Sequence, residues 1–325
     1  MSQEETLMAL PREAGKVWRS FLPFPMELER CACPLCSSAK AQTLMPFDQF
    51  GFPVGTVECE ECGFVYTNPR PTESYMRFFY EKYFWFFFQG RHKLNERFFR
   101  RQRTREWAAL KFSRCAPYLS EAKSILEIGA GSGLFLDLVR KNFPDMAVAG
   151  IEPDPKMAKY CREELKLDVQ NGFFQDYQGH DVFDVIALFH VIEHLFDFTS
   201  LFQFIRKHLA PGGLLIMEAP NVDGEWKTVY MIQLSHLHIF SPRTIKNLFS
   251  ANGFEVIGLK CLQNDLDESN LFIAGRLTDA PHGAPAPRDP QESMRIQAKF
   301  QKMPSSRALL VLRAWARMAY FALRQ

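Results

Sequence analysis

The sequence predicts an α/β protein with a Rossmann-like sheet, a small cysteine-containing module before it and a helix after it. From Ser124 onward, short apolar runs alternate with amphipathic stretches, which is typical of repeated strand–helix–strand units. A glycine-rich turn follows the first apolar run, and two cysteine pairs stand between residues 31 and 72. These three observations define the fold class and divide the chain.

Composition limits the classes of protein to which the chain can belong. Its 325 residues suffice for about two domains of roughly 150 residues. Lys and Arg number 39 and Asp and Glu 37, so the net charge of +2 does not favour a nucleic-acid partner. No apolar run is long enough for a membrane span, and the N-terminus lacks the apolar segment of a secretory signal. We therefore expect a cytoplasmic protein, of open oligomeric state.

The apolar runs have the length and composition of buried parallel strands. We expect strands over 124–128, 146–152, 183–189 and 213–220. Amphipathic stretches over 133–142 and 155–166 are predicted to be the helices that cover the sheet.

The two cysteine pairs predict a structural zinc site. They are Cys33-Pro-Leu-Cys36 and Cys59-Glu-Glu-Cys62, with 22 residues between them. Four thiolates in two tight turns suit a tetrahedral Zn²⁺, and such a closed site folds the module without taking part in chemistry. The alternatives are unrelated thiols in a reducing compartment, or a redox pair; neither pair opens a helix after a strand, as a redox motif would.

The glycine-rich turn predicts a ligand site. Glu127 ends the first strand and is followed by Gly129, Gly131 and Gly133, and Glu152 ends the second strand 19 residues later. Glycines allow a ligand to approach the backbone closely, and an acidic residue at that distance suits ribose hydroxyls. The glycine spacing differs from the G-x-G-x-x-G of a dinucleotide site. The alternative is a glycine turn without a ligand.

The loop resembles motif I of the class I S-adenosylmethionine (SAM)-dependent methyltransferases. The order of further motifs, FDVIALFHVIEHL (183–195), LAPGG (209–213), LHIFSP (237–242) and ANGF (251–254), is similar to ubiquinone O-methyltransferase-like and sugar methyltransferases. The segment CGFVYTNPRP (62–71) resembles the end of the zinc module of deoxysugar C-methyltransferases. The resemblance spans about 31–275 and implies a class I methyltransferase sheet with a zinc-ribbon-like module.

The resemblance also implies where the cofactor lies. In that family the glycine loop passes beside the amino-acid end of SAM, and the acid after the second strand takes the ribose. Phe189 ends the fourth strand and is a candidate cofactor contact, because in that family the segment after this strand faces the transferred methyl group. Asp176, just before that strand, could hold the adenine amino group, or could be an ordinary loop residue.

Three histidines are the candidate catalytic residues. Methyl transfer to oxygen or carbon requires alignment of the acceptor and removal of a proton, and His suits the second task at neutral pH. His190 follows the fourth strand, and His236 and His238 precede Phe240. The sugar enzymes have a site histidine at the position of His238, preceded by Glu, whereas this chain has Leu237.

A structural role for these histidines is the competing interpretation. The segment His190-x-x-Glu193-His194 could instead order the loop after the fourth strand, and His194 is a fourth, weaker candidate for the base.

Six segments summarise the expected organisation. They are a lead-in segment (1–30), the zinc module (31–72), an aromatic and basic helical lid or connector (73–120), the methyltransferase domain (121–275), a linker (276–303) and a basic amphipathic helix (304–325). The last helix carries Arg313, Arg317 and Arg324 on one side. That pattern suits peripheral contact with a membrane surface, or packing against protein.

The sequence thus predicts a SAM-dependent methyltransferase that acts on oxygen or carbon of a small molecule, a sugar or a glycoconjugate. One alternative is an RNA or protein methyltransferase that uses the zinc module for recognition. The chain lacks an Asp/Asn-Pro-Pro-Tyr motif after the fourth strand, which argues against methylation of base amino groups. The other alternative is a relative that binds SAM or S-adenosylhomocysteine (SAH) without catalysis.

Overall fold

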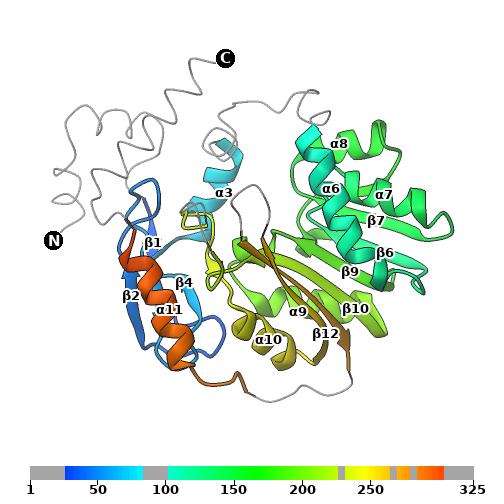
Figure 1. Cartoon of the computed structure of the whole chain (residues 1–325). Coiled ribbons are helices and arrows are strands. Elements are labelled where there is room, and N and C mark those ends of the chain that lie inside the picture. The colour runs from blue at the N-terminus through cyan, green and yellow to red at the C-terminus, as the bar shows by residue number, and fades with distance from the viewer. Residues whose placement is uncertain (1–25, 83–101, 226–230, 264–268, 279–283, 304–325) are drawn as a thin grey trace.

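A computed structural model describes residues 26–82, 102–225, 231–263, 269–278 and 284–303. These residues form a three-layer α/β domain and a smaller sheet that packs beside it (Figure 1). The predicted helix at 304–325, most of the lead-in segment and residues 83–101 of the aromatic and basic block lie outside the described residues. Within those that are described, no helix is both long and apolar enough to cross a membrane.

The main sheet has seven strands in the order β12-β13-β10-β9-β6-β7-β8. The strands are β6 (Ser124–Ile128), β7 (Ala147–Glu152), β8 (Asp168–Asn171), β9 (Phe183–Phe189), β10 (Leu209–Pro220), β12 (Phe254–Gln263) and β13 (Ser269–Leu277). The strands from β6 to β10 pair in parallel, whereas β13 runs antiparallel between β10 and β12. The predicted Rossmann-like sheet is confirmed, and β10 begins four residues earlier than expected.

Helices cover both faces of this sheet. The first face carries α6 (Gln102–Cys115), α7 (Leu134–Asn142) and α8 (Pro155–Glu163), and the second carries α9 (Phe198–His208) and α10 (Pro242–Ala251). Each face has its own cluster of buried apolar side chains. The site described below therefore rests on a core that is packed on both sides.

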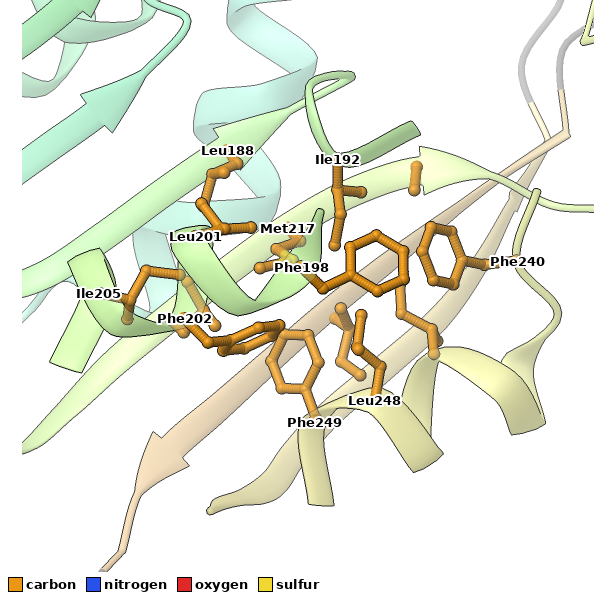
Figure 2. Close-up of a cluster of buried hydrophobic side chains, with 14 of the residues drawn as sticks. Leu188, Ile192, Phe198, Leu201, Phe202, Ile205, Met217, Phe240, Leu248 and Phe249 are labelled. Atoms are coloured by element: carbon orange, nitrogen blue, oxygen red, sulfur yellow. The ribbon is translucent and has the colours of Figure 1, made fainter. Parts of the chain in front are cut away.

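The sequence of α9 explains how the second face is buried. Phe198, Leu201, Phe202 and Ile205 recur at helical spacing and are all buried, so they form one apolar stripe. Figure 2 shows this stripe packed between the sheet and α10. The side chain of Asp197 accepts hydrogen bonds from two backbone N–H groups of the first turn and fixes the start of the helix.

The smaller sheet contains four antiparallel strands in the order β11-β4-β3-β2. They are β2 (Ala41–Met45), β3 (Thr56–Cys59), β4 (Val65–Thr67) and β11 (His238–Ile239). A separate pair joins β1 (Leu28–Glu29) to β5 (Arg70–Pro71), and α3 (Glu73–Lys82) follows. Because β11 comes from the segment after β10, the predicted module at 31–72 completes its sheet with a strand from the larger domain.

The prediction of a linker over 276–303 is wrong for its second half. This segment contains α11 (Pro290–Gln301), whose first turn begins with proline and is capped by the side chain of Asp289. Ile296 and Phe300 are buried and pack against the smaller sheet. The proline-rich stretch before α11 ends at the first residue of the helix. The linker was predicted from the composition of that stretch, which gives no sign of the apolar stripe in the residues after it.

Phe64 joins the smaller sheet to the second face of the main sheet. Its side chain is fully buried. Its ring centroid lies 5.1 Å from that of Phe240, 5.8 Å from that of His238 and 6.2 Å from that of Phe198. Figure 2 shows Phe198 and Phe240, two of these partners, side by side in the buried cluster.

We expect Phe64→Ala to lower the free energy of unfolding by about 3–5 kcal/mol, because it leaves a cavity at this junction. Urea unfolding followed by circular dichroism measures the change. The control is Phe173→Ala, which truncates an exposed ring and should cost less than about 1 kcal/mol. An equal decrease in the free energy of unfolding in both variants would show that packing of Phe64 at this junction does not stabilise the protein.

Candidate functional site

The glycine loop opens towards unfilled space at one position. Gly129, Gly131 and Gly133 all have positive φ angles, of 76°, 54° and 69°. A Cβ atom at Gly129 would lie 2.6 Å from Val191, and one at Gly133 would lie 2.7 Å from the sulfur of Cys161. Among the described residues, nothing lies within 4 Å of a Cβ at Gly131. The outer glycines are therefore needed for packing, and Gly131 borders the space that a ligand could enter.

Glu152, at the end of β7, holds this loop. Its Oε2 atom accepts a hydrogen bond of 2.7 Å from the N–H of Gly131, and Oε1 accepts one of 2.8 Å from Asp154. The side chain is buried, and burial raises the pKa of its carboxyl group to about 7. The structure thus brings Glu152 and the glycine loop together, as the sequence predicted, and the remaining lone pairs of the carboxylate can accept hydrogen bonds from hydroxyl groups.

Glu127, at the end of β6, is a buried acid without a hydrogen-bond partner in the described ranges. Neither of its side-chain oxygens has a hydrogen-bond partner within the described part of the chain. Burial raises the pKa of Glu127 to about 8. An unpaired buried carboxylate is costly unless a cation or donor satisfies it. The ammonium group of an amino acid, such as the methionyl part of SAM, would do so.

Lys111 of α6 places a cation beside this pair of acids. Its Nζ atom lies 4.7 Å from the ring centroid of Phe189, and its charge lowers the pKa values of both Glu127 and Glu152 against the effect of burial. The ring of Phe189 in turn packs against the ring of Phe135 of α7, with the two ring centroids 4.9 Å apart. The sequence analysis did not single out Lys111, because one lysine in a basic helix gives no distinctive signal.

Asp176 lies at the same edge of the sheet. It ends the short helix η2 (Phe174–Asp176) and is exposed. Gly172, directly after β8, connects it to Glu152. The N–H of Gly172 donates to the carbonyl oxygen of Glu152 at 3.1 Å, and a Cβ at Gly172 would lie 3.7 Å from that of Asp176. Asp176 therefore stands beside the predicted ribose-binding acid with its carboxylate accessible.

His190 and Glu193 form a close pair after β9. His190 has a φ of 57°, an uncommon backbone conformation for a residue other than glycine. Its Nδ1 atom lies 3.0 Å from Oε1 of Glu193, and its Nε2 atom is buried without a partner among the described residues. Burial lowers the pKa of His190, but the hydrogen bond and charge of Glu193 outweigh this, so the pKa is raised overall.

His194 and His236 lie beside this pair and face each other. Their ring centroids are 4.8 Å apart. Nδ1 of His194 lies 2.7 Å from the carbonyl oxygen of Ser235, and Nδ1 of His236 lies 3.0 Å from that of Met231. Burial lowers the pKa of both rings, that of His236 to about 3, so both are neutral at pH 7.

His238 has the surroundings of a packing residue. Its ring lies 4.5 Å from that of Phe198 and 5.8 Å from that of Phe64, and its Nε2 atom donates to the carbonyl oxygen of Leu195 at 2.8 Å. Burial lowers its pKa to about 3. The geometry therefore favours His190 over His238 as the group that could accept a proton.

A buried ion pair supports His190 from the other side, and the sequence analysis missed it. Nη1 of Arg114, on α6, lies 2.7 Å from Oε1 of Glu218, near the end of β10. The side chain of Arg114 is 13% exposed and that of Glu218 is fully buried. The carbonyl oxygen of Glu218 also accepts the N–H of His190 at 2.9 Å. The sequence did contain one indication of this ion pair, a glutamate inside the apolar run 213–220. An acid in a buried strand needs a cationic partner.

The four predicted zinc ligands converge at the tip of the smaller sheet. The sulfurs of Cys33 and Cys62 are 3.6 Å apart, those of Cys36 and Cys59 are 3.5 Å apart, and all four lie within 4.8 Å of one another. A tetrahedral ion with Zn–S bonds of about 2.3 Å places sulfurs roughly 3.8 Å apart. The donor set therefore fits a structural zinc ion.

The parallel sheet, the glycine loop and the acids at the ends of β6 and β7 define a nucleotide-cofactor-binding α/β domain. Residues 99–259 match the family model described as a methyltransferase domain. This part of the chain is therefore a methyltransferase domain, in agreement with the resemblance of its loop motif to the class I SAM-dependent methyltransferases.

Two curated methyltransferases and one solved structure are among the proteins that the chain resembles. The chain is 27% identical over 146 residues to a demethylspheroidene O-methyltransferase of Rhodobacter capsulatus, a match covering 42% of this chain and 37% of the relative. It is 21% identical to a ubiquinone biosynthesis O-methyltransferase of Rickettsia canadensis, over 47% of this chain and 71% of the relative. A SAM-dependent methyltransferase from Archaeoglobus fulgidus aligns with a TM-score of 0.45 and 20% identity, over 53% of this chain and 94% of that structure.

The unpaired acid Glu127 leads to a prediction about stability and pH. Its pKa is raised from 4.5 to about 8 in the folded chain, so the folded state holds a proton that the unfolded state loses. Stability contributed by this proton is lost as the pH rises from about 4.5 through 8. We expect Glu127→Gln to melt at least about 2 °C higher than the wild type at pH 8.5, and the difference to vanish near pH 4.5.

Differential scanning fluorimetry of the cofactor-free protein between pH 4.5 and 8.5 measures this difference. Glu121→Gln changes an exposed glutamate just before the same strand and is the matched control. Parallel melting curves for the wild type and Glu127→Gln at every pH would contradict the assignment of an unpaired buried acid.

Proposed function

We propose that this protein transfers the methyl group of SAM to an oxygen or carbon atom of a small-molecule, sugar or glycoconjugate acceptor. The observation that carries the proposal is the arrangement of Glu127, Gly131 and Glu152 within the methyltransferase domain. Glu127 is buried without a partner among the described residues, and the backbone at Gly131 borders open space. Glu152 accepts one hydrogen bond from this loop and has lone pairs to spare. All three lie at the ends of the adjacent strands β6 and β7.

Each of these groups has a counterpart in SAM. The hydroxyl groups of the ribose would donate to Glu152, and the ammonium group of the methionyl part would satisfy Glu127. Lys111, beside Phe189, would attract the cofactor's carboxylate. Asp176, exposed at the same edge, would accept a hydrogen bond from the adenine amino group. When bound, the cofactor supplies an electrophilic methyl group on its sulfonium.

His190 would remove the acceptor's proton. The acceptor's proton would move to Nε2 of His190 as the methyl group leaves the sulfonium sulfur, which is released as SAH, and bonds to the acceptor's oxygen or carbon. Glu193, which accepts from Nδ1, is a positioning residue: it fixes the tautomer and stabilises the imidazolium that results. Removing His190 should therefore slow transfer while leaving the cofactor site intact.

The names of the matched relatives favour oxygen as the acceptor atom. Both curated relatives described above are O-methyltransferases. Since the match covers 37% of the length of the first of them, its acceptor is not carried over to this chain. The proposal is thus limited to the class of acceptor.

The cysteine cluster would hold a structural Zn²⁺. Four thiolates close its coordination sphere, so the ion would have no position open to substrate. Its role would be to fold the two cysteine turns and so orient the smaller sheet, which packs on the methyltransferase domain through Phe64.

We expect His190→Ala to lower the rate of methyl transfer by a factor of about 10²–10⁴, the usual contribution of a general base. The assay incubates methyl-labelled SAM with the protein and fractionated extract of its host. Label should enter the small-molecule, sugar or lipid fraction. Titration calorimetry should find SAH binding by His190→Ala changed by less than about threefold, equivalent to less than 1 kcal/mol.

His180→Ala, which changes an exposed histidine, is the control and should transfer at the wild-type rate. Label confined to RNA or to protein would contradict the proposed acceptor class. SAH binding without transfer to any fraction would favour a ligand-binding relative.

We expect Cys36→Ser to lose one equivalent of zinc and to melt at a lower temperature, because three thiolates bind the ion less tightly than four. Elemental analysis by mass spectrometry and a melting curve measure the two effects. Cys261→Ser replaces an exposed cysteine outside the cluster and should change neither. Unchanged zinc content in Cys36→Ser would refute the assignment.

A further inference from the structure

A second group of metal-binding side chains lies beside His190. One ligand atom each of Glu193, His194 and His236 lies within 4.8 Å of the others. Glu193 and His194 come from the short helix η3 (Ile192–His194), and His236 comes from the segment just before β11. Two parts of the chain that are 42 residues apart thus supply one compact set of nitrogen and oxygen donors.

The two histidines are held in the tautomer that a metal requires. In each ring Nδ1 faces a backbone carbonyl oxygen, that of Ser235 at 2.7 Å for His194 and that of Met231 at 3.0 Å for His236. Nδ1 of His194 also lies 3.0 Å from the hydroxyl oxygen of Tyr80, which can accept as well as donate. A carbonyl oxygen only accepts, so Nδ1 carries the hydrogen and Nε2 carries the lone pair. Support of one ring nitrogen by a backbone carbonyl is the usual second shell of a metal-binding histidine.

Glu193 supplies an oxygen that has no partner. Its side chain is fully buried, and Oε1 bonds to Nδ1 of His190. Oε2 is buried and lacks a hydrogen-bond partner among the described residues. A buried carboxylate oxygen of this kind needs a cation or a donor.

We propose that Glu193, His194 and His236 bind a divalent first-row transition-metal ion, distinct from the ion in the four-cysteine site. Two imidazole nitrogens and one carboxylate oxygen suit Zn²⁺, Fe²⁺ or Mn²⁺ better than the oxygen-seeking Ca²⁺ or Mg²⁺. The side-chain amide of Gln233 donates to Nε2 of His236, and the ion would take the place of this contact. The side-chain oxygen of Gln233 also accepts a hydrogen bond from Gln49, so Gln233 keeps one partner when the ion replaces this contact.

The proposed metal site lies next to the proposed base, which suggests a role in binding the acceptor. Three protein ligands leave at least one coordination position open, as in catalytic zinc sites, whereas four cysteines leave none. Glu193 also contacts His190, so the open position would adjoin the proposed base and could hold an oxygen atom of the acceptor. This role in catalysis rests on the proposed function, whereas the binding of the metal does not.

The test is substitution of the full-length protein with Co²⁺, by expression in minimal medium that contains cobalt as the supplied transition metal. Mass spectrometry counts the metal per chain. The visible spectrum separates the two sites, because thiolate ligands give intense charge-transfer bands and a nitrogen–oxygen site gives weak ligand-field bands. The wild type should hold two equivalents and show both kinds of band.

Glu193→Gln should hold one equivalent, with its thiolate bands unchanged, which also shows that the smaller sheet is folded. His194→Gln, at a half-buried position, should do the same and serves if Glu193→Gln does not fold. The matched control is His208→Gln, a buried histidine whose Nδ1 also faces a carbonyl oxygen but which lies outside the cluster. It should hold two equivalents.

One equivalent of cobalt in the wild type, with thiolate bands alone, would overturn the inference, as would equal metal content in the wild type and both cluster variants. Titration of the same samples with SAH keeps the two proposals apart. SAH binding with a single metal equivalent contradicts the second site alone. Two equivalents without SAH binding or methyl transfer contradicts the proposed function alone.

Discussion

Buried acids at the carboxyl ends of the parallel strands are the constraint on which the rest of the site depends. Four neighbouring strands, β10, β9, β6 and β7, each carry one such acid at or just after the end. They are Glu218, Glu193, Glu127 and Glu152, and all are at most 6% exposed. Buried carboxylates are tolerated only where donors or cations meet them. The surrounding structure supplies such donors or cations to three of the four acids.

Three of these acids therefore each fix a neighbouring element. Glu152 draws in the N–H of Gly131 and so shapes the glycine loop, and Glu218 anchors α6 through Arg114. Glu193 aims the ring of His190. Glu127 alone has no hydrogen-bond partner among the described residues. In the proposed function, the ammonium group of SAM would satisfy this fourth acid.

The sequence predicted the fold and the geometry of the glycine loop because both depend on local patterns. Strand periodicity and glycine spacing predicted that Gly131 and Glu152 lie together, as their hydrogen bond shows, and the cysteine spacing predicted the cluster of four thiols. The histidines could not be ranked from sequence, since their roles depend on partners far along the chain, such as Leu195 for His238. For the same reason α11 was mistaken for a linker: its apolar stripe is meaningful only against the smaller sheet.

Binding of SAH tests whether Glu152 holds the ribose of the cofactor. Titration calorimetry measures the affinity for SAH of the wild type, Glu152→Ala and Glu163→Ala. Glu163 is an exposed glutamate on α8, and its variant is the control. We predict one bound SAH per chain in the wild type and the control. Glu152→Ala should bind at least tenfold more weakly, a loss of about 1.4 kcal/mol or more. Equal affinity in all three proteins, or no binding by the wild type, would contradict the account.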